Sequence, residues 1–369
     1  MGSINESIMK SSLWFLVVFV PLGLAGCAMI LVGFALLPPF SQSPAGALAP
    51  TEAALLETTS LPKTVSVVTA VPTPESTATA PPPTMILSTR TPTSTPYPAP
   101  RGQIVFACFD GNDDEICLMN VDDALSGAGY GQLTHNATGD FYPSLSNDGQ
   151  SIIFAHQIHG SNYEIFRMDT DGSNVTQLTF NGGGNFAPAY SPDDSLVAFT
   201  STQGGGAQQI WVMDSNGNSQ RQLTAQNTNA DPTWSPDGRQ IAFASITADN
   251  AQIWVMNADG SNPRQVTNIA YVGGRNSWSP DGRTLIFYAG KREDRNRNIF
   301  SINLAGGGAA QLTFEGDNLG PSFSPDGGWI AFTSYRDGDN DIYIMRFDGS
   351  NVINLTDNSS SEYQPRWGP

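Results

Sequence analysis

The sequence predicts an all-β fold, a closed six-bladed β-propeller of four-stranded antiparallel blades, from three observations. A unit of about 44 residues recurs from Tyr142 to the C-terminus, and its proline stands at positions 143, 188, 232, 321 and 365, with Asn276 in the one missing place. Each unit contains four short runs rich in Val, Ile, Phe, Tyr and Trp. Residues 103–134, ahead of the first complete unit, contain only three such runs, and the C-terminus supplies the fourth. A period in the 40s with four strands per unit is typical of propeller blades.

The order of elements within a unit is clearest in residues 232–256 and 321–345. The first strand ends in Ser-Pro-Asp-Gly, which suits a type I turn because Pro presets φ and Gly closes the turn. A second strand reads Ile-Ala-Phe, a third reads Ile-aromatic-x-Met, and an Asp-Gly turn leads to a fourth that ends in Leu-Thr or Val-Thr. No window has a sustained 3.6-residue period, so we expect no helix within the repeats. One aromatic side chain per unit is expected to fill the layer between blades: Tyr190, Trp234, Trp278, Phe323 and Trp367.

The two ends of the repeat region predict how the ring closes. Residues 103–134 contain three strand-like runs and lack the first strand of a blade. Residues 363–367 are a lone copy of that missing strand. We therefore expect 363–367 to pair with the strands of 103–134 in a composite sixth blade, which removes exposed strand edges.

The repeated pattern Pro-x-Trp-Ser-Pro-Asp-Gly, Ile-Ala-Phe, Ile-Trp-Val-Met, Asp-Gly resembles the WD-like repeat of the TolB β-propeller family. The resemblance covers residues 101–369, about three-quarters of the chain. It implies a six-bladed propeller in an exported bacterial protein that works by binding other proteins. TolB carries a folded α/β domain before its propeller, whereas this chain has an apolar segment and a Thr/Pro-rich tract. The resemblance therefore does not imply a role in the Tol–Pal envelope system.

The residues before the propeller predict attachment to a membrane. Residues 13–37 contain no charged side chain and are long enough to cross a bilayer. Lys10 precedes them and favours a cytoplasmic N-terminus. We expect an uncleaved transmembrane signal anchor. The alternative is a lipoprotein signal, because Leu-Ala-Gly-Cys at 24–27 matches a lipobox and would make Cys27 the lipidation site.

Both alternatives place the propeller on the extracytoplasmic side of the cytoplasmic membrane, and the signal anchor would make the chain a single-pass protein. A tract rich in Thr, Pro and Ser follows the apolar segment and is expected to be a disordered linker, because it cannot bury a core. The predicted organisation is a short cytoplasmic N-terminus at 1–11, the anchor at 12–37, the linker at 38–100 and the propeller at 101–369.

Charge limits the classes of partner. The chain has 17 basic and 34 acidic residues, and residues 101–369 keep 14 and 30 of them, a net charge of −16. So acidic a domain is repelled by nucleic acid and by anionic lipid surfaces. We therefore expect no nucleic-acid partner, and a monomeric propeller that binds a protein or peptide.

Few residues suggest catalysis. The sequence contains no nucleophile elbow, phosphate loop or His-Glu-x-x-His motif. We expect no enzymatic activity and no cofactor. The alternative is a metal-dependent enzyme that cleaves carbohydrate or peptide at the channel mouth, because some propellers with this repeat are lyases whose metal is held by histidines. His156 and His159 could hold a metal, or they could be two polar surface residues.

Two other patterns suggest a metal and a disulfide. Asp337, Asp339 and Asp341 place oxygen atoms at alternate positions, as calcium loops do, although we favour a solvated hairpin turn. Cys108 and Cys117 flank the first hairpin, and in an exported protein they predict a cross-strand disulfide. Two half-buried thiols are the alternative.

The loops suggest where a partner binds. The turns from first to second and from third to fourth strand are nearly identical between units, whereas the other connections differ in every unit and should share one face. A repeat protein that varies one face presents a recognition surface there. The basic residues of 291–297 are expected to contact an acidic peptide, an acidic polysaccharide or a phosphate group, or else to form a solvated hairpin tip. The candidate binding residues of this face and of the channel mouth are Phe141, Tyr142, His156, His159, Phe186, Asp231, Arg275, Lys291, Arg292, Arg295, Arg297, Arg336 and Tyr363.

The function that these patterns favour is a membrane-tethered scaffold that binds protein or peptide through its variable loops. The enzyme described above is the second hypothesis, and a purely structural spacer of the envelope is the third.

Overall fold

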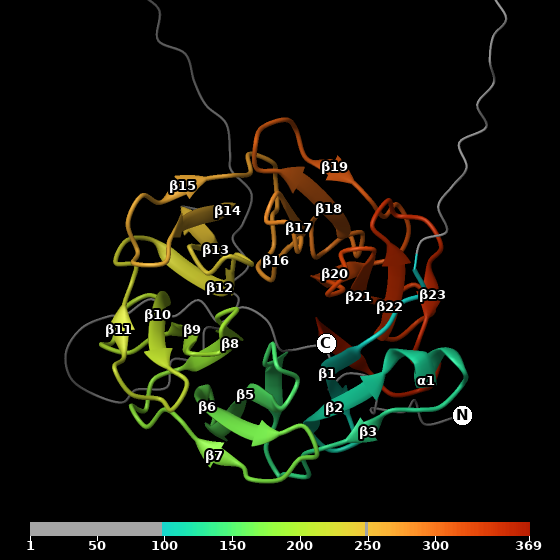
Figure 1. Cartoon of the computed structure of the whole chain (residues 1–369), viewed down its shortest axis with the longest axis horizontal. Coiled ribbons are helices and arrows are strands. Elements are labelled where there is room, and N and C mark those ends of the chain that lie inside the picture. Colours follow the sequence, from blue (N-terminus) through green and yellow to red (C-terminus); the bar gives the residue numbers. More distant parts are fainter. Residues whose placement is uncertain (1–97, 248–249) are drawn as a thin grey trace, which may run out of the picture. The chain divides into compact units, whose positions relative to one another are not determined.

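Six four-stranded antiparallel sheets, built from the described residues, surround a common axis (Figure 1). The structure is a computed structural model that describes residues 98–247 and 250–369. It confirms the six-bladed propeller. The predicted anchor at 12–37, Cys27 and residues 38–97 of the predicted linker lie outside the described residues. Within the described ranges, no helix is long and apolar enough to cross a membrane.

We name the blades A to F around the ring and give the innermost strand first. Blade A comprises β24 (Glu362–Gly368), β1 (Gln103–Phe109), β2 (Asp114–Asn120) and β3 (Gly131–Gln132). Blade B comprises β4 (Asp140–Leu145), β5 (Ser151–His159), β6 (Asn162–Asp169) and β7 (Thr176–Gln177). Blade C comprises β8 (Asn185–Tyr190), β9 (Leu196–Ser201), β10 (Gln209–Asp214) and β11 (Arg221–Gln222).

The remaining three blades follow in chain order. Blade D comprises β12 (Thr228–Trp234), β13 (Gln240–Thr247), β14 (Asn250–Asn257) and β15 (Arg264–Gln265). Blade E comprises β16 (Ser277–Trp278), β17 (Thr284–Ala289), β18 (Asn298–Asn303) and β19 (Ala310–Gln311). Blade F comprises β20 (Asn318–Phe323), β21 (Trp329–Ser334), β22 (Asp341–Arg346) and β23 (Ile353–Asn354).

Blade A joins the beginning and the end of the propeller. β24 pairs antiparallel with β1, with Gln103 opposite Gly368 and Ile104 opposite Trp367. The indole Nε1 of Trp367 also donates to the carbonyl of Arg101 at 2.8 Å. The predicted composite blade is therefore confirmed, and the C-terminal strand closes the ring.

Contact with the propeller begins slightly before residue 101. The indole Nε1 of Trp329, at the start of β21, donates to the carbonyl of Pro98 at 3.0 Å. The chain thus passes along blade F before it enters β1 of blade A.

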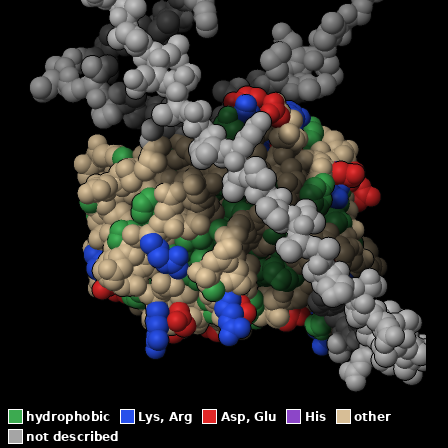
Figure 2. Space-filling model, turned by 90° about the horizontal axis from the view of Figure 1, so that it is seen from above, with side chains coloured by type: hydrophobic (Ala, Val, Ile, Leu, Met, Phe, Trp, Pro, Cys, Tyr) green, Lys and Arg blue, Asp and Glu red, His purple; other side chains and the backbone are tan. Residues whose placement is uncertain are grey.

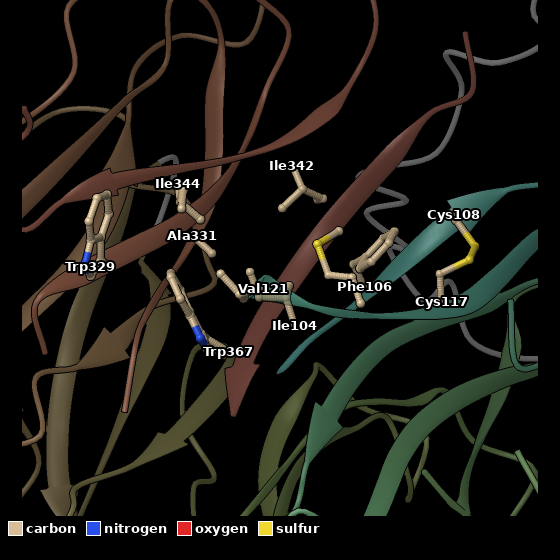
Figure 3. Close-up of a cluster of buried hydrophobic side chains, with 11 residues drawn as sticks. Ile104, Phe106, Cys108, Cys117, Val121, Trp329, Ala331, Ile342, Ile344 and Trp367 are labelled. Carbon is tan, nitrogen blue, oxygen red and sulfur yellow. A yellow bond between two sulfur atoms is a disulfide. The ribbon is translucent and has the colours of Figure 1, made fainter. Parts of the chain in front are cut away.

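The hydrophobic core of the described residues is divided into six layers, one between each pair of neighbouring blades. Between blades A and F, Ile104, Phe106 and Trp367 pack against Ala331 and Ile344 (Figure 3). The aromatic residues that were predicted to fill these layers are buried in them: Tyr190, Trp234, Trp278, Phe323 and Trp367. Because one blade cannot bury both faces of its sheet, these layers hold the ring together.

The threonine that ends each repeat locks its blade. In blade D, the backbone N–H of Ile253 donates to Thr267 Oγ1 at 2.9 Å, and this hydroxyl donates to Gln252 Oε1 at 2.7 Å. All six blades of the described structure contain this threonine lock, with the acceptor supplied by Glu115, Glu164, Gln209, Gln252, Asn298 or Asp341. The lock ties the fourth strand to the start of the third, which explains the constant Leu-Thr or Val-Thr.

A short helix, α1 (Val121–Leu125), follows β2 where other blades have a tight turn. Asn120 caps it, because its side-chain oxygen accepts from the backbone N–H of Asp122 at 3.1 Å. Asp122 and Asp123 also place negative charge at the helix N-terminus. The expectation that the repeats contain no helix is wrong here, because a capped segment of five residues is too short to show a helical period.

Candidate functional site

The two classes of loop lie on opposite faces of the ring, as antiparallel strands require. Loops between second and third strands contact loops between fourth and first strands: Phe109 N donates to Ser361 O at 2.9 Å, and Asn318 N donates to Arg297 O at 2.8 Å. We call the face that carries these loops the variable face. The opposite face, which carries the Ser-Pro-Asp-Gly turns, is the constant face.

On the constant face, the same side-chain bonds recur from blade to blade. In blade D, Ser235 Oγ donates to Asp237 Oδ1 at 2.6 Å, and this bond lowers the pKa of the Asp237 carboxyl. Gly238 has a φ of 69°, in the left-handed region that favours glycine. A Cβ there would lie 3.7 Å from Pro192 Cδ in the turn of blade C. The repeated aspartates of this face therefore serve the fold.

Among the described residues, the three most exposed aromatic side chains lie on the variable face. Phe180 is 75% exposed, Phe314 is 76% exposed and Tyr271 is 51% exposed. Phe180 and Phe314 occupy the same place in two blades, directly after the Leu-Thr of the threonine lock. Exposed aromatic side chains are enriched where proteins bind one another. Sequence analysis missed all three residues, although comparing the residue after Leu-Thr across the units would have found Phe180 and Phe314.

Close to Phe180 in the chain, the variable face contains a hollow of about 370 Å³ between blades B and C. Loops 161–162, 181–184 and 202–205 line it with glycines, amides and hydroxyls. Figure 2 shows one side of the domain, where charged side chains stand in small groups on a surface of mainly uncharged groups. None of the residues that line the hollow is charged, so it offers hydrogen bonds without charge.

Two arginines of the variable face, Arg297 and Arg336, make side-chain contacts with other residues of the propeller. Arg297 forms a bidentate ion pair with Asp317, with Nε 2.8 Å from Oδ1 and Nη2 2.5 Å from Oδ2. Arg336 Nε donates to Ser334 Oγ at 2.9 Å, and its guanidinium lies 4.6 Å from the centre of the Tyr343 ring. These contacts fix the loops that carry the two arginines.

Two other basic residues of the 291–297 loop contact aromatic rings. Lys291 Nζ is 5.1 Å from the ring centre of Tyr271, and the Arg295 guanidinium is 4.9 Å from that of Tyr335. Both cations, with Arg292, are exposed. The predicted basic cluster is thus divided, since Arg297 is paired while these three cations remain at the surface.

The two candidate histidines are not brought together. His156 Nδ1 lies 2.6 Å from Asp140 Oδ1 across β4 and β5, whereas His159 is exposed at the tip of the hairpin.

The structure also divides the predicted calcium ligands: Asp341 is buried in the threonine lock of blade F, and Asp337 accepts from the hydroxyl of Tyr343. Asp339 stays at the hairpin. Within the described ranges, no three His, Cys, Asp or Glu side chains are placed to hold a metal ion.

Cys108 and Cys117 form a disulfide that joins β1 to β2 in blade A (Figure 3). Their Cα atoms are 5.9 Å apart, and both residues are buried. The bond therefore staples the hairpin of the composite blade.

Phe141 and Tyr363, which were predicted to rim the channel mouth, have side chains that contact other residues of the propeller. Phe141 is 9% exposed, and its ring meets the Tyr163 ring edge-on with centres 5.9 Å apart. The hydroxyl of Tyr363 donates to Asp114 Oδ1, and burial raises the pKa of that carboxyl. Both aromatic residues therefore fix the entrance loops of their blades.

In each of the six blades of the described ring, one residue of the innermost segment has a left-handed backbone, and its position is the same in every blade. It directly precedes the repeated proline, or Asn276 in blade E, and its φ lies between 25° and 60°. In the five other blades the ladder is bulged beside this residue. A bulge redirects the side chain that it carries. These six residues are Tyr142, Ala187, Asp231, Arg275, Gly320 and Gln364.

Two arginines reach across the axis to each other's strands. Arg275 Nη2 of blade E donates to the carbonyl of Gln364 in blade A at 3.3 Å. In return, Arg366 Nη1 of blade A donates to the carbonyl of Asn276 in blade E at 3.0 Å. The Arg275 guanidinium also lies 5.4 Å from the ring centre of Tyr142 in blade B. Three blades thus meet at the axis through one pair of arginines.

Glycines make room for this arrangement. A Cβ at Gly274 would lie 1.7 Å from Asp231 Oδ2, which accepts from the backbone N–H of Arg275 at 3.1 Å. A Cβ at Gly320 would lie 3.5 Å from Arg275 Cδ. We call Tyr142, Asp231, Arg275, Gln364 and Arg366 the axial cluster. Sequence analysis singled out its first three members and missed Gln364 and Arg366.

The comparisons with known proteins agree with this geometry. A family model described as the TolB beta propeller domain matches residues 182–313 and 232–369, which together exceed half of the chain. The chain belongs to this family. A segment of 83 residues is 41% identical to an uncharacterized protein of Agrobacterium fabrum, and a segment of 78 residues is 35% identical to the Tol-Pal system protein TolB of Geobacter sulfurreducens. These matches cover 22% and 21% of this chain, and 28% and 18% of the curated relatives' lengths.

Solved structures show the same fold. TolB from Acinetobacter baumannii matches with a TM-score of 0.65 at 20% identity, over 74% of this chain and 69% of that one. An oligogalacturonate lyase in complex with manganese matches with a TM-score of 0.50 at 16% identity, over 70% of this chain and 75% of that one. Both likenesses concern the arrangement of blades.

Proposed function

We propose that this protein is a scaffold that binds a protein or peptide through the variable face of its propeller, outside the cytoplasmic membrane. Residues 12–37 would anchor it as a single-pass protein, and residues 38–97 would separate the propeller from the bilayer. Membership of the TolB propeller family supports a protein-binding role. The name of the Geobacter relative assigns that protein to the Tol-Pal system, and we do not extend that assignment to this chain.

The observation that carries the proposal is the difference between the two faces. The constant face repeats one turn, with the same serine–aspartate bond, in five blades of the described ring. The variable face instead carries loops that differ in every blade, the hollow beside Phe180 and the three most exposed aromatic side chains of the described residues. A scaffold that is constant on one side and variable on the other is suited to recognition by the variable side.

Site-specific crosslinking tests the proposal. A photoreactive phenylalanine analogue is placed at Phe180 or at Phe314 of the full-length chain in cells, and captured proteins are identified by mass spectrometry. The matched control is the same analogue at Val175, which is 54% exposed on the constant face of blade B. The same partner should be captured from both variable-face positions and not from Val175. Equal capture from all three positions would refute a binding role for the variable face.

Nothing in the described residues favours the enzyme hypothesis over the scaffold. The likeness to the lyase shows the fold alone, and the histidines that could have held a metal lie apart. The scaffold therefore remains the proposal.

A further inference from the structure

The axial cluster contains buried polar atoms that have no hydrogen-bond partner among the described residues. They are Nε and Nη1 of Arg275, Nε2 of Gln364 and Oδ1 of Asp231. Arg275 is 7% exposed and Gln364 is 5% exposed. Buried polar groups in folded proteins are nearly always paired. The three unpaired donors, two on Arg275 and one on Gln364, therefore call for an acceptor, and the unpaired oxygen of Asp231 calls for a donor.

The charge of the axial cluster is unbalanced. Two guanidinium groups, those of Arg275 and Arg366, share one carboxylate, that of Asp231, whose Oδ2 is already used by a backbone N–H. Burial, together with the charge of Arg275, lowers the pKa of Arg366 to about 9, so Arg366 stays protonated at neutral pH. The centre of an acidic propeller therefore carries one excess positive charge.

We propose that the axial cluster binds a carboxylate, which accepts from Arg275 and Gln364 and neutralises the excess charge. A carboxylate brings a single negative charge, which matches the imbalance, whereas phosphate brings about −1.5 to −2 at neutral pH, exceeds the imbalance and is repelled more strongly by Asp231. The rings of Tyr142 and Phe186, whose centres are 5.6 Å apart, supply an apolar wall for the carbon atoms beside the carboxylate.

Part of the axial cluster is exposed to solvent. Tyr142, Asp231 and Arg366 are each partly exposed, whereas Arg275 and Gln364 are buried. A carboxylate could therefore come from a free small organic acid or from a side chain or C-terminus of a peptide. The site does not depend on the proposed function, because a free acid can occupy it whether or not a protein binds the variable face.

Thermal unfolding of the full-length chain, kept in a non-ionic detergent, tests this inference. Sodium acetate is compared with sodium chloride and sodium phosphate at equal ionic strength, and a peptide with blocked ends and one glutamate forms a fourth arm. The variants are Arg275→Gln and Arg366→Gln. The matched control is Arg239→Gln, which removes an exposed arginine after the turn of the constant face.

Acetate should raise the Tm of the wild type and of Arg239→Gln by about 3 °C relative to chloride, and should raise neither axial variant. If Arg275→Gln does not fold, Arg366→Gln alone carries the comparison, with titration calorimetry of acetate as the second measurement. A shift with acetate alone assigns a free acid, and shifts with acetate and peptide assign a site open to protein carboxylates. An equal acetate shift in all variants, no shift in the wild type, or a larger shift with phosphate would overturn the proposal.

Discussion

Closure of the ring can be tested at Trp367, which lies in the last strand of the chain. Its side chain is 8% exposed in the layer between blades A and F, and its Nε1 donates to the Arg101 carbonyl at 2.8 Å. Replacing a buried tryptophan by alanine costs about 3–5 kcal/mol in the free energy of unfolding, because it removes apolar contacts and leaves a cavity. For a domain of this size roughly 2 °C of Tm is lost per kcal/mol. Trp367→Ala should therefore lower the Tm by roughly 6–10 °C in scanning calorimetry.

Trp278→Ala is the matched control. Trp278 holds the same place in blade E, is 7% exposed, and its Nε1 donates to the Thr233 carbonyl at 3.2 Å. If blade A is equivalent to the other blades, the two variants should lose similar stability. A Tm for Trp367→Ala within about 2 °C of the wild type, beside a large loss for Trp278→Ala, would refute closure through β24. Removal of residues 362–369 should destabilise the domain further, because it also removes the pairing of β24 with β1.

Three further predictions concern other parts of the ring. Burial raises the pKa of Asp341 to about 6, so its ionised form is disfavoured in the folded state, and protonation of this carboxyl adds stability as the pH falls through 6 towards 4. Asp341→Asn should lack that gain and should exceed the wild type in Tm more at about pH 7.5 than at about pH 5; a pH-independent difference in Tm would contradict this assignment. Reducing the disulfide between Cys108 and Cys117 should lower the free energy of unfolding by about 2–3 kcal/mol in denaturant titrations, and identical midpoints with and without reductant would argue against a staple. Gly274→Ala should cost about 1–3 kcal/mol and abolish the acetate shift, since its Cβ would meet Asp231 Oδ2; a variant that keeps both its Tm and the shift would show that the glycine is not required.

The repeat predicted the blade because its information is local. Alternating apolar residues, the Ser-Pro-Asp-Gly turn and the missing first strand together determine four strands, their order and the closing pair, and all of these were found. The recurring Leu-Thr was visible in the sequence, but the threonine lock was not, since its acceptor changes between acid and amide from blade to blade. Only the fold shows that Gln252 and Asp341 occupy equivalent positions.

The axial cluster could not be predicted because its partners come from different blades. Arg275 and Arg366 are 91 positions apart in the sequence, and the period of the repeat places them at different depths along the inner strands. The sequence marked the place only indirectly, through Asn276 where the other units have proline. The loop at 291–297 presents a different difficulty, because its four basic residues cannot be distinguished in the sequence. Only the fold shows that Asp317 lies beside Arg297 and forms an ion pair with it.

The chain enters and leaves the propeller through the same blade, and this has a mechanical consequence. Tension applied ahead of Pro98 reaches β1 first, and β1 is paired with the C-terminal strand on one side and with β2 on the other. The sulfur bridge between β1 and β2 passes that load to a second strand through a covalent link. A pull on this side therefore strains β1 and β2 together, so that β1 cannot be stripped from the blade alone.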